Sequence, residues 1–406
     1  MKIREDLNLL NKPGKSRFQG EIVIILALIL LCSGCRLTYV FHAAAGQFRL
    51  LHNSIPMEEA LEDNSLGTDQ KKRLRLVARI KDFGEKELGL KKTRNYETVY
   101  LESPQAPIYM VSASPKDRLD RITWWFPVVG DMPYLGFFDL KKAKAEEEKL
   151  LKKDLDVIIG RADAYSTLGW FRDPVTMNLV TGSFVDLAEI ILHEMTHTTL
   201  YVKGQGEFNE GLAGLVGKAG AFLFLKKTYG PTHPLTIAAQ KSIEDERIFS
   251  PFLKLLLEKL KHLYDSPISY QEKLTEREKI FARSIEEFNC LKNRLHTDRF
   301  TRFGTAKLNN AYLMSVGLYH ENFLFFESVL KKNGNSIRET LAFFKGLARE
   351  EGDIMKRTRE WLGPGIPTAS PFCKGGLRGI FLVQPESIEN LPSRRLTNSN
   401  NWLNLD

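Results

Sequence analysis

Apolar positions recur at helical spacing in two segments of the first ninety residues. Residues 39–61, "YVFHAAAGQFRLLHNSIPMEEAL", predict one helix that leads the chain into its domain. Residues 70–88 predict a second helix, because Leu74, Val77 and Ile80 follow one another at intervals of three and share one face. Both helices are expected to pack through a single apolar stripe.

The middle of the chain has the alternating pattern of strands. Residues 98–110 and 121–138 mix β-branched and aromatic residues with Pro and Gly, which favours strands. Residues 156–171, "DVIIGRADAYSTLGWF", predict two further short strands around glycine breaks. Between them, the charged segment 140–153 predicts a surface helix.

The second half of the chain is helical in pattern. Residues 184–362 contain a predicted hairpin of two long amphipathic helices around Pro267. After residue 362, Pro, Gly, Ser and Asn replace the periodic apolar residues, so residues 363–406 are expected to be a disordered tail. The predicted fold class is α+β and predominantly helical, with a small sheet on the N-terminal side and a helical C-terminal half.

Composition and charge indicate a globular protein and argue against a nucleic-acid-binding protein. With 406 residues and 43% apolar residues, the chain can form a substantial core. Its net charge of +8 arises from basic and acidic residues that are interleaved along the chain. No basic face with aromatic residues between the charges is visible, so no nucleic-acid partner is expected.

The first 34 residues have the pattern of an export signal. Several basic residues precede an apolar run, residues 22–32, that is about half the length needed to span a membrane. Ser33, Gly34 and Cys35 resemble a bacterial lipobox, although Cys32 stands where Leu is usual. We expect a lipidated Cys35 that anchors the mature domain, residues 35–362, in the cell envelope facing the periplasm. An ordinary signal peptide cleaved nearby is the alternative.

A metal-binding motif opens the helical half. In "HEMTH", His193 and His197 are four residues apart, which places both imidazoles on one face of a helix at the spacing that a single Zn²⁺ needs. Glu194 is rotated about 100° from His193, so it can border the metal without ligating it. A carboxylate in this place can take a proton from a metal-bound water.

A catalytic zinc has three protein ligands, so a third must come from elsewhere. Glu210 is the strongest candidate, in the first turn of a helix for which Asn209 is the predicted N-cap. Weaker candidates remain open at Glu189, Glu207 and His233.

Three glycines support a close approach of this second helix. Gly211, Gly214 and Gly217 recur every three residues, and their lack of side chains would let the helix pack tightly on the first. The longer pattern HExxHxxGxxH is excluded, because Leu200 and Lys203 occupy the positions of its Gly and its third His.

Four stretches together resemble a known family. They are "AAAGQFRLL", "AYSTLGWFRDP", "HEMTHTTLYVKGQGEFNEGLA" and "NNAYLMSVGLY". Over about residues 35–360 the chain resembles the bacterial "Putative aminopeptidase" group of lipoprotein-like zinc peptidases in the gluzincin clan. The resemblance implies a gluzincin-like core and one zinc ion per chain. It implies His193, His197 and Glu210 (in "NEGLA") as ligands and Glu194 as general base.

The chain also departs from that clan. The 12 residues between His197 and Glu210 are few, and Gly214 stands where some relatives have an Asp that supports a histidine ligand. The Gly-x-Met-Glu-Asn element of well-known zinc aminopeptidases is absent, so the choice between exo- and endopeptidase stays open.

The expected function is zinc-dependent hydrolysis of a peptide substrate in the envelope, as an aminopeptidase. Tyr319 is the candidate donor to the oxyanion, with Tyr165 as the alternative. The segment around Ala164 and Ser166 is either a strand that pairs with the peptide or a core strand. The alternative functions are an envelope zinc-binding or assembly protein without activity, an endopeptidase, and a cell-wall amide hydrolase.

Overall fold

A computed structural model describes residues 34–102, 108–126, 130–162 and 172–363. The chain divides into two units, Met1–Ser370 and Pro371–Asp406, and the second lies outside the described residues. Residues 1–33 of the predicted signal segment and residues 364–406 of the predicted tail also lie outside them. Within the described part, helices outnumber short strands, which confirms a predominantly helical α+β fold. None of the described helices is both long and apolar enough to cross a membrane.

The N-terminal part departs from the prediction in the first of its two predicted helices. It contains α2 (Gly34–His52), β1 (Ser54–Pro56), α3 (Met57–Glu62) and α4 (Thr68–Phe83), which continues into a π-helical turn (Gly84–Leu88). The helix predicted over residues 39–61 is wrong at β1, because Ile55 pairs with Val99 of β2 and Pro56 offers no N–H to a helix. The prediction for α4 is confirmed, since its apolar stripe is fully buried.

Seven further strands form small sheets. They are β2 (Thr98–Tyr100), β3 (Ile108–Pro115), β4 (Trp124–Phe126), β5 (Gly130–Met132), β6 (Leu135–Phe137), β7 (Leu155–Ala162) and β8 (Val175–Thr176). The strand orders are β1-β2-β8, β6-β3-β7 and β4-β5. The longest pairing joins β3 to β7 antiparallel, from Ile108 opposite Ala162 to Pro115 opposite Leu155. The strand predicted after β7 lies outside the described residues.

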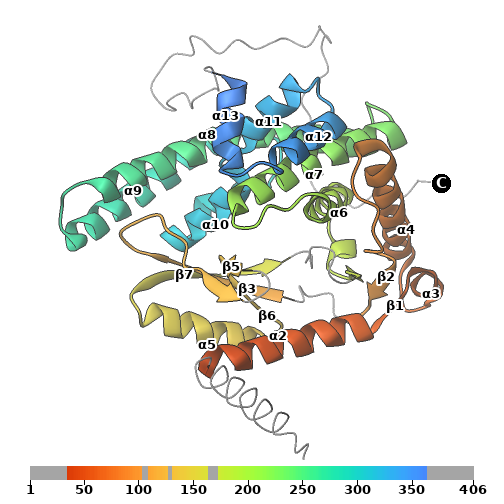
Figure 1. Cartoon of the computed structure of the whole chain (residues 1–406), viewed down its shortest axis with the longest axis horizontal. Helices are drawn as coiled ribbons and strands as arrows, with labels where there is room; N and C mark the ends of the chain where they lie inside the picture. Colours follow the sequence, from red (N-terminus) through yellow and green to blue (C-terminus); the bar gives the residue numbers. More distant parts are fainter. Residues whose placement is uncertain (1–33, 103–107, 127–129, 163–171, 364–406) are drawn as a thin grey trace, which may run out of the picture. The chain divides into compact units, whose positions relative to one another are not determined.

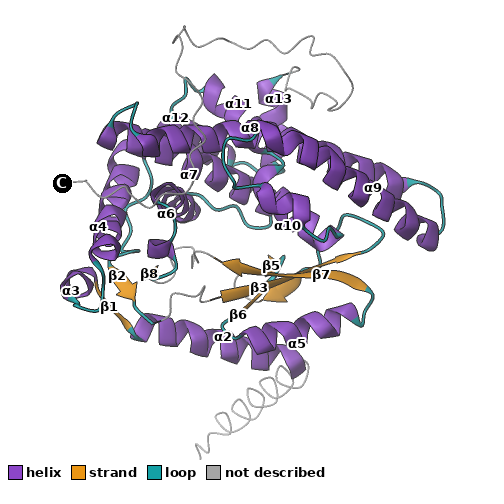
Figure 2. Cartoon of the chain, turned by 180° about the vertical axis from the view of Figure 1, so that it is seen from behind, coloured by secondary structure: helices purple, strands orange, loops and turns teal. Residues whose placement is uncertain are grey.

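Helices cover both faces of the β6-β3-β7 sheet. The predicted charged helix is α5 (Leu140–Leu151), which packs on the sheet through Ala143 and Leu150. On the other face lies α10 (Asn310–His320), as Figures 1 and 2 show. The sheet is therefore a middle layer, with α5 and α2 on one face and α10 of the helical half on the other.

The helical half contains eight α-helices among the described residues. They are α6 (Phe184–Thr199), α7 (Gly206–Tyr229), α8 (Pro234–Asp265), α9 (Tyr270–Leu291), α10, α11 (Phe323–Lys332), α12 (Ile337–Leu347) and α13 (Ile354–Leu362). Short 3-10 turns occur at Leu179–Thr181, Lys292–Arg294 and Thr301–Thr305. The hairpin of α8 and α9 is confirmed, and Ser269 begins α9 with a capping box to Glu272.

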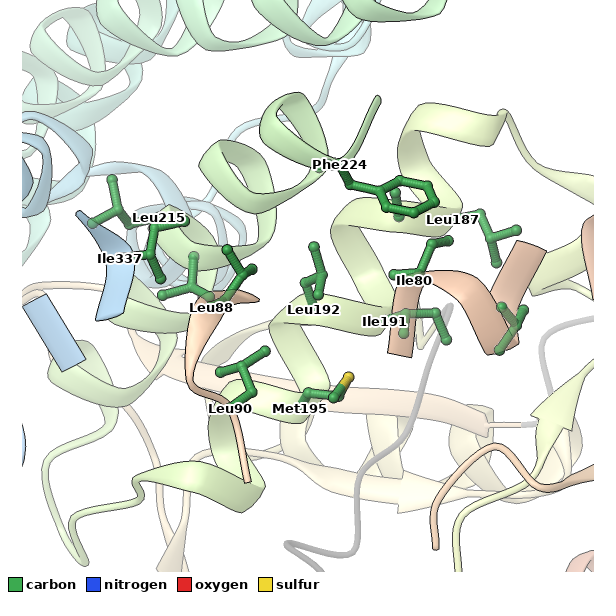
Figure 3. Close-up of a cluster of buried hydrophobic side chains, with 14 of the residues drawn as sticks. Ile80, Leu88, Leu90, Leu187, Ile191, Leu192, Met195, Leu215, Phe224 and Ile337 are labelled. Carbon is green, nitrogen blue, oxygen red and sulfur yellow. The ribbon is translucent and has the colours of Figure 1, made fainter. Parts of the chain in front are cut away.

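The main hydrophobic core surrounds α6. Leu192 and Met195 of α6 lie among Ile80 of α4, Leu215 of α7 and Leu88, as Figure 3 shows. These side chains are almost completely removed from water. Because protein cores are close-packed, α6 has little freedom to shift or rotate, and its polar residues are held in fixed positions.

Candidate metal centre

Helix α6 presents its two histidines on one side. Ser183 begins the helix, and its hydroxyl accepts a hydrogen bond from the backbone N–H of Asp186. The apolar residues of the helix point into the core, which leaves His193 and His197 one turn apart on a neighbouring face. Their ring centroids are 4.8 Å apart.

The start of α7 differs from the prediction. The helix begins at Gly206, so Asn209 is not its N-cap and Glu210 lies in the second turn. The buried Asn209 side chain instead bonds to the backbone of Val202, with its amide donating to the carbonyl and its oxygen accepting from the N–H, both at 2.8 Å. Asn209 thereby closes the connection between the helices and brings Glu210 back beside α6.

Only one of the three predicted glycines lies against α6. A Cβ at Gly217 would be 2.7 Å from the carbonyl oxygen of Glu189 and 3.3 Å from Cβ of His193. Gly211 faces α11 and Gly214 faces α10, so the prediction that all three line the first helix is wrong. The close approach of α6 and α7 depends on Gly217.

Three polar atoms from the two helices form a compact triangle. The Nε2 atom of His193 is 3.2 Å from Oε2 of Glu210 and 3.1 Å from Nε2 of His197. The third side, from His197 Nε2 to Glu210 Oε2, is 3.5 Å. Ligands bound about 2.0–2.1 Å from a tetrahedral zinc ion lie about 3.3–3.4 Å from one another, so this triangle fits three ligand positions of such an ion.

Burial and neighbouring charges shift the pKa values of the residues at this centre in opposite directions. Burial raises the pKa of Glu194, and Glu210 adds to this, while the two histidines act in the other direction. Burial alone would lower the pKa of His197, but Glu210 and Glu194 outweigh it and raise the pKa. The histidines hold the pKa of Glu210 well below its usual range against the effect of burial. Two partly buried carboxylates thus share this place, and a divalent cation would neutralise them.

The three weaker candidates for the third ligand, Glu189, Glu207 and His233, each bind another protein group instead. Oε2 of Glu189 is 2.6 Å from the guanidinium of Arg299. Glu207 forms a partly exposed ion pair with Arg121 at 3.2 Å. The ring of His233 accepts a hydrogen bond at the start of α8. Among the described residues, only His193, His197 and Glu210 form a group of this kind.

Of the two tyrosines predicted as oxyanion donors, Tyr319 lies beside the centre. Its ring centroid is 6.2 Å from that of His193. The negative charge of Glu210, together with burial and the charge of Glu194, raises the pKa of Tyr319 well above its ordinary value. Tyr319 therefore keeps its proton and can donate a hydrogen bond. Tyr165 lies outside the described residues.

A cluster of charged residues around the buried Glu246, outside the triangle, was not predicted from the sequence. Glu246 of α8 is fully buried, 3.2 Å from Nζ of Lys218 on α7 and 3.0 Å from Nδ1 of His320 on α10. Nothing in the sequence pattern links positions so far apart, and only the packing of the three helices brings them together.

Comparison with known proteins gives one family match. Residues 38–360 match the family described as "Putative aminopeptidase", and this range includes the triangle, Glu194 and Tyr319. Neither the curated proteins nor the solved structures yield a match.

Proposed function

Because the chain belongs to the family described as "Putative aminopeptidase", we propose that it hydrolyses peptide bonds with one zinc ion held by His193, His197 and Glu210. The observation that carries this proposal is the triangle of ligand atoms with sides of 3.1 to 3.5 Å, next to the unligated carboxylate of Glu194. A purely structural zinc site would have no use for a base at that place.

The proposed mechanism assigns one proton-transfer residue. Zinc, when bound, supplies Lewis-acid polarisation of the peptide carbonyl and acidifies the attacking water. Glu194 accepts the proton of that water and passes it to the leaving amine. The desolvated setting of Glu194, which raises its pKa, favours its acceptance of the proton.

Tyr319 is the proposed donor to the developing oxyanion. Support comes from its place beside His193 and from its raised pKa, which keeps the hydroxyl protonated. A hydrogen-bond donor fixed in a desolvated site stabilises transition-state charge at little cost of reorganisation.

Glu194→Gln tests the proposal. The amide keeps the shape of the side chain and leaves both histidines in place, so zinc content should stay at about one ion per chain. Turnover of peptides should fall by several orders of magnitude, because the base is lost. In the unmodified protein, a chelator should abolish turnover and added zinc should restore it. Undiminished turnover by the variant would contradict the assigned role of Glu194.

The aminopeptidase specificity rests on the family description. It requires recognition of a free α-ammonium group, which can be tested by comparing one peptide with a free and with an acetylated N-terminus. Preferential cleavage of the free peptide supports an exopeptidase. Equal cleavage of both peptides would identify an endopeptidase.

We also propose that the protein is anchored in the cell envelope through a lipidated Cys35. The support is the apolar run that ends in Ser33 and Gly34. Mass spectrometry of the mature N-terminal peptide should show a lipid on Cys35. An unmodified cysteine, or a mature chain that starts elsewhere, would overturn the proposal.

A further inference from the structure

One face of α7 connects the metal centre to the last turn of α10. Glu210, Gly214 and Lys218 follow one another at intervals of four residues, so they lie on the same side of the helix at successive turns. Glu210 belongs to the triangle of ligand atoms. The backbone of Tyr319 lies beside Gly214, because its carbonyl oxygen would be 3.6 Å from a Cβ added there. The last turn of α10 therefore packs on α7 one helical turn from Glu210.

The next residue of α10, His320, is bound to the buried Glu246 of α8. Its Nδ1 atom lies 3.0 Å and 3.1 Å from the two carboxylate oxygens of Glu246. Because Glu246 is an ionised carboxylate, it can only accept, so Nδ1 of His320 donates this hydrogen bond. The imidazole also packs edge-on against Phe249 and Phe300, with ring centroids 5.8 Å and 5.2 Å away. These contacts fix both the place and the orientation of the ring.

Lys218 joins the same group from α7. Its Nζ atom is 3.2 Å from Oε1 of Glu246, and the two residues are 8% and 0% exposed. A buried ion pair is often no more stabilising than apolar residues of the same volume. Stability alone thus gives little reason for these buried charges. Their hydrogen-bond geometry, in contrast, permits only one arrangement of α7, α8 and α10.

The orientation of α10 determines where the side chain of Tyr319 points. Neighbouring residues of an α-helix are rotated by about 100° about its axis, so a helix held at His320 has a fixed direction for Tyr319 as well. In this orientation the ring centroid of Tyr319 is 6.2 Å from that of His193. A second bond from α8 supports it, since the hydroxyl of Ser250 donates to the carbonyl oxygen of Glu321 at 3.0 Å.

We propose that Glu246 is a positioning residue, which fixes the orientation of α10 through His320 and so holds the Tyr319 hydroxyl at the developing oxyanion. This inference rests on the proposed function, in which Tyr319 is the oxyanion donor. Such a donor is effective because it is held in place before the reaction begins. A displacement of about 1 Å, caused by a change far from the reacting atoms, can lower the rate about 100-fold. Glu246 acts through α10 and does not itself meet the substrate.

Two variants break the bond between Glu246 and α10 from its two ends. For Glu246→Gln and for His320→Leu we expect kcat to fall about 10–100-fold. KM and zinc content should stay unchanged, because the oxyanion forms only in the transition state and the ligand triangle is intact. The His320 side chain is 20% exposed. His320→Leu should therefore fold and decide the matter even if the loss of the buried charge in Glu246→Gln prevents folding.

Asp245→Asn is the matched control on the same helix. Asp245 is also 0% exposed, but its carboxylate accepts hydrogen bonds from the backbone N–H groups of His296 at 2.7 Å and Thr297 at 2.8 Å. It thus stabilises the segment before α10 and not the end of that helix. Asp245→Asn should lower the midpoint of thermal unfolding and leave kcat unchanged.

A Tyr319→Phe background tests whether Glu246 acts through Tyr319. Once the hydroxyl is absent, adding Glu246→Gln or His320→Leu should change kcat much less than in the unmodified protein. An equal loss in both backgrounds, full turnover by His320→Leu, or a fall in kcat for Asp245→Asn like that for Glu246→Gln would each overturn the inference. Full turnover by Tyr319→Phe alone would instead refute the donor named in the proposed function, and the inference would fall with it.

Discussion

At the scale of single residues, burial and neighbouring charge act in opposite directions on the carboxylates of this protein. Burial dominates at Glu194 and raises its pKa. At Glu246 burial also acts to raise the pKa, but the positive charges of His320, Lys218 and Arg299 outweigh it and lower the pKa to about 2. Glu194 is thus prepared to accept a proton, whereas the buried Glu246 is held as a permanent anion.

The lowered pKa of Glu246 predicts an acid-dependent loss of stability. The folded-state pKa of about 2 lies below the ordinary value of 4.5, so the stabilising contribution is complete above 4.5 and is lost as the pH falls toward 2. Glu246→Gln should lower the free energy of unfolding by about 3 kcal/mol at neutral pH and by clearly less near about pH 3. Denaturant unfolding at the two pH values measures this.

The exposed Glu276 provides the control for that prediction. Its ion pair with Lys279 lies on the surface, where such pairs contribute little. Glu276→Gln should leave the free energy of unfolding almost unchanged at either pH. A stability difference for Glu246→Gln that is the same at neutral and acid pH would contradict the role given to its charge.

At the scale of elements, the metal centre depends on how closely α7 packs against α6. Gly217→Ala should separate the two helices, because its new methyl group would meet the carbonyl oxygen of Glu189 in α6 at 2.7 Å. We expect a loss of about 1–3 kcal/mol in stability and weaker zinc binding, since Glu210 moves away from both histidines. Thermal unfolding and zinc titration measure the two effects.

Gly214→Ala is the matched control in the same helix. The nearest atom to its new methyl group is the carbonyl oxygen of Tyr319 at 3.6 Å, an ordinary contact. Because Ala is also the better helix former, this variant should be as stable as the unmodified protein or up to about 1 kcal/mol more stable. Similar losses for both glycine variants would show that helix approach at Gly217 is not the controlling feature.

The elements that could be predicted from sequence are those specified by local pattern. Helix α6 follows from its apolar spacing, and the hairpin of α8 and α9 follows from two amphipathic stripes around a turn. The start of α7 was mispredicted because Asn209, a good N-cap type, uses its side chain to bond Val202 in the preceding loop. Whether Asn209 caps the helix or bonds to Val202 depends on the tertiary path of the chain. Local helix propensity carries no information about that path.

The same limit applies to the candidate site. Spacing alone places His193 and His197 on one helix face, and the "NEGLA" stretch suggested Glu210. The buried cluster of Glu246, Lys218 and His320 comes from three different helices, and only the packing of these helices brings the three residues together. No local sequence pattern predicts such a cluster.

At the scale of the whole molecule, the matched family range of residues 38–360 nearly coincides with the described helical and sheet elements. The last of these elements, α13, buries Ile354, Met355 and Thr358. A chain that ends at Leu362 should therefore fold, keep its zinc and unfold at the same midpoint as the full chain.

A chain that ends at Asp353 is the control for this truncation. It lacks α13 and exposes the apolar surface that this helix covers, so its unfolding midpoint should be clearly lower. If the chain that ends at Leu362 also loses zinc or stability, residues 363–406 contribute to the domain and the predicted boundary is wrong.

The zinc content of purified variants tests the central claim most directly. We predict about one zinc ion per chain in the unmodified protein and in Glu194→Gln, and a much lower content in Glu210→Ala, which lacks one of three ligands. Elemental analysis of the three proteins, prepared side by side, gives the answer. If Glu210→Ala binds zinc as tightly as the unmodified protein, the triangle of His193, His197 and Glu210 is not the metal centre.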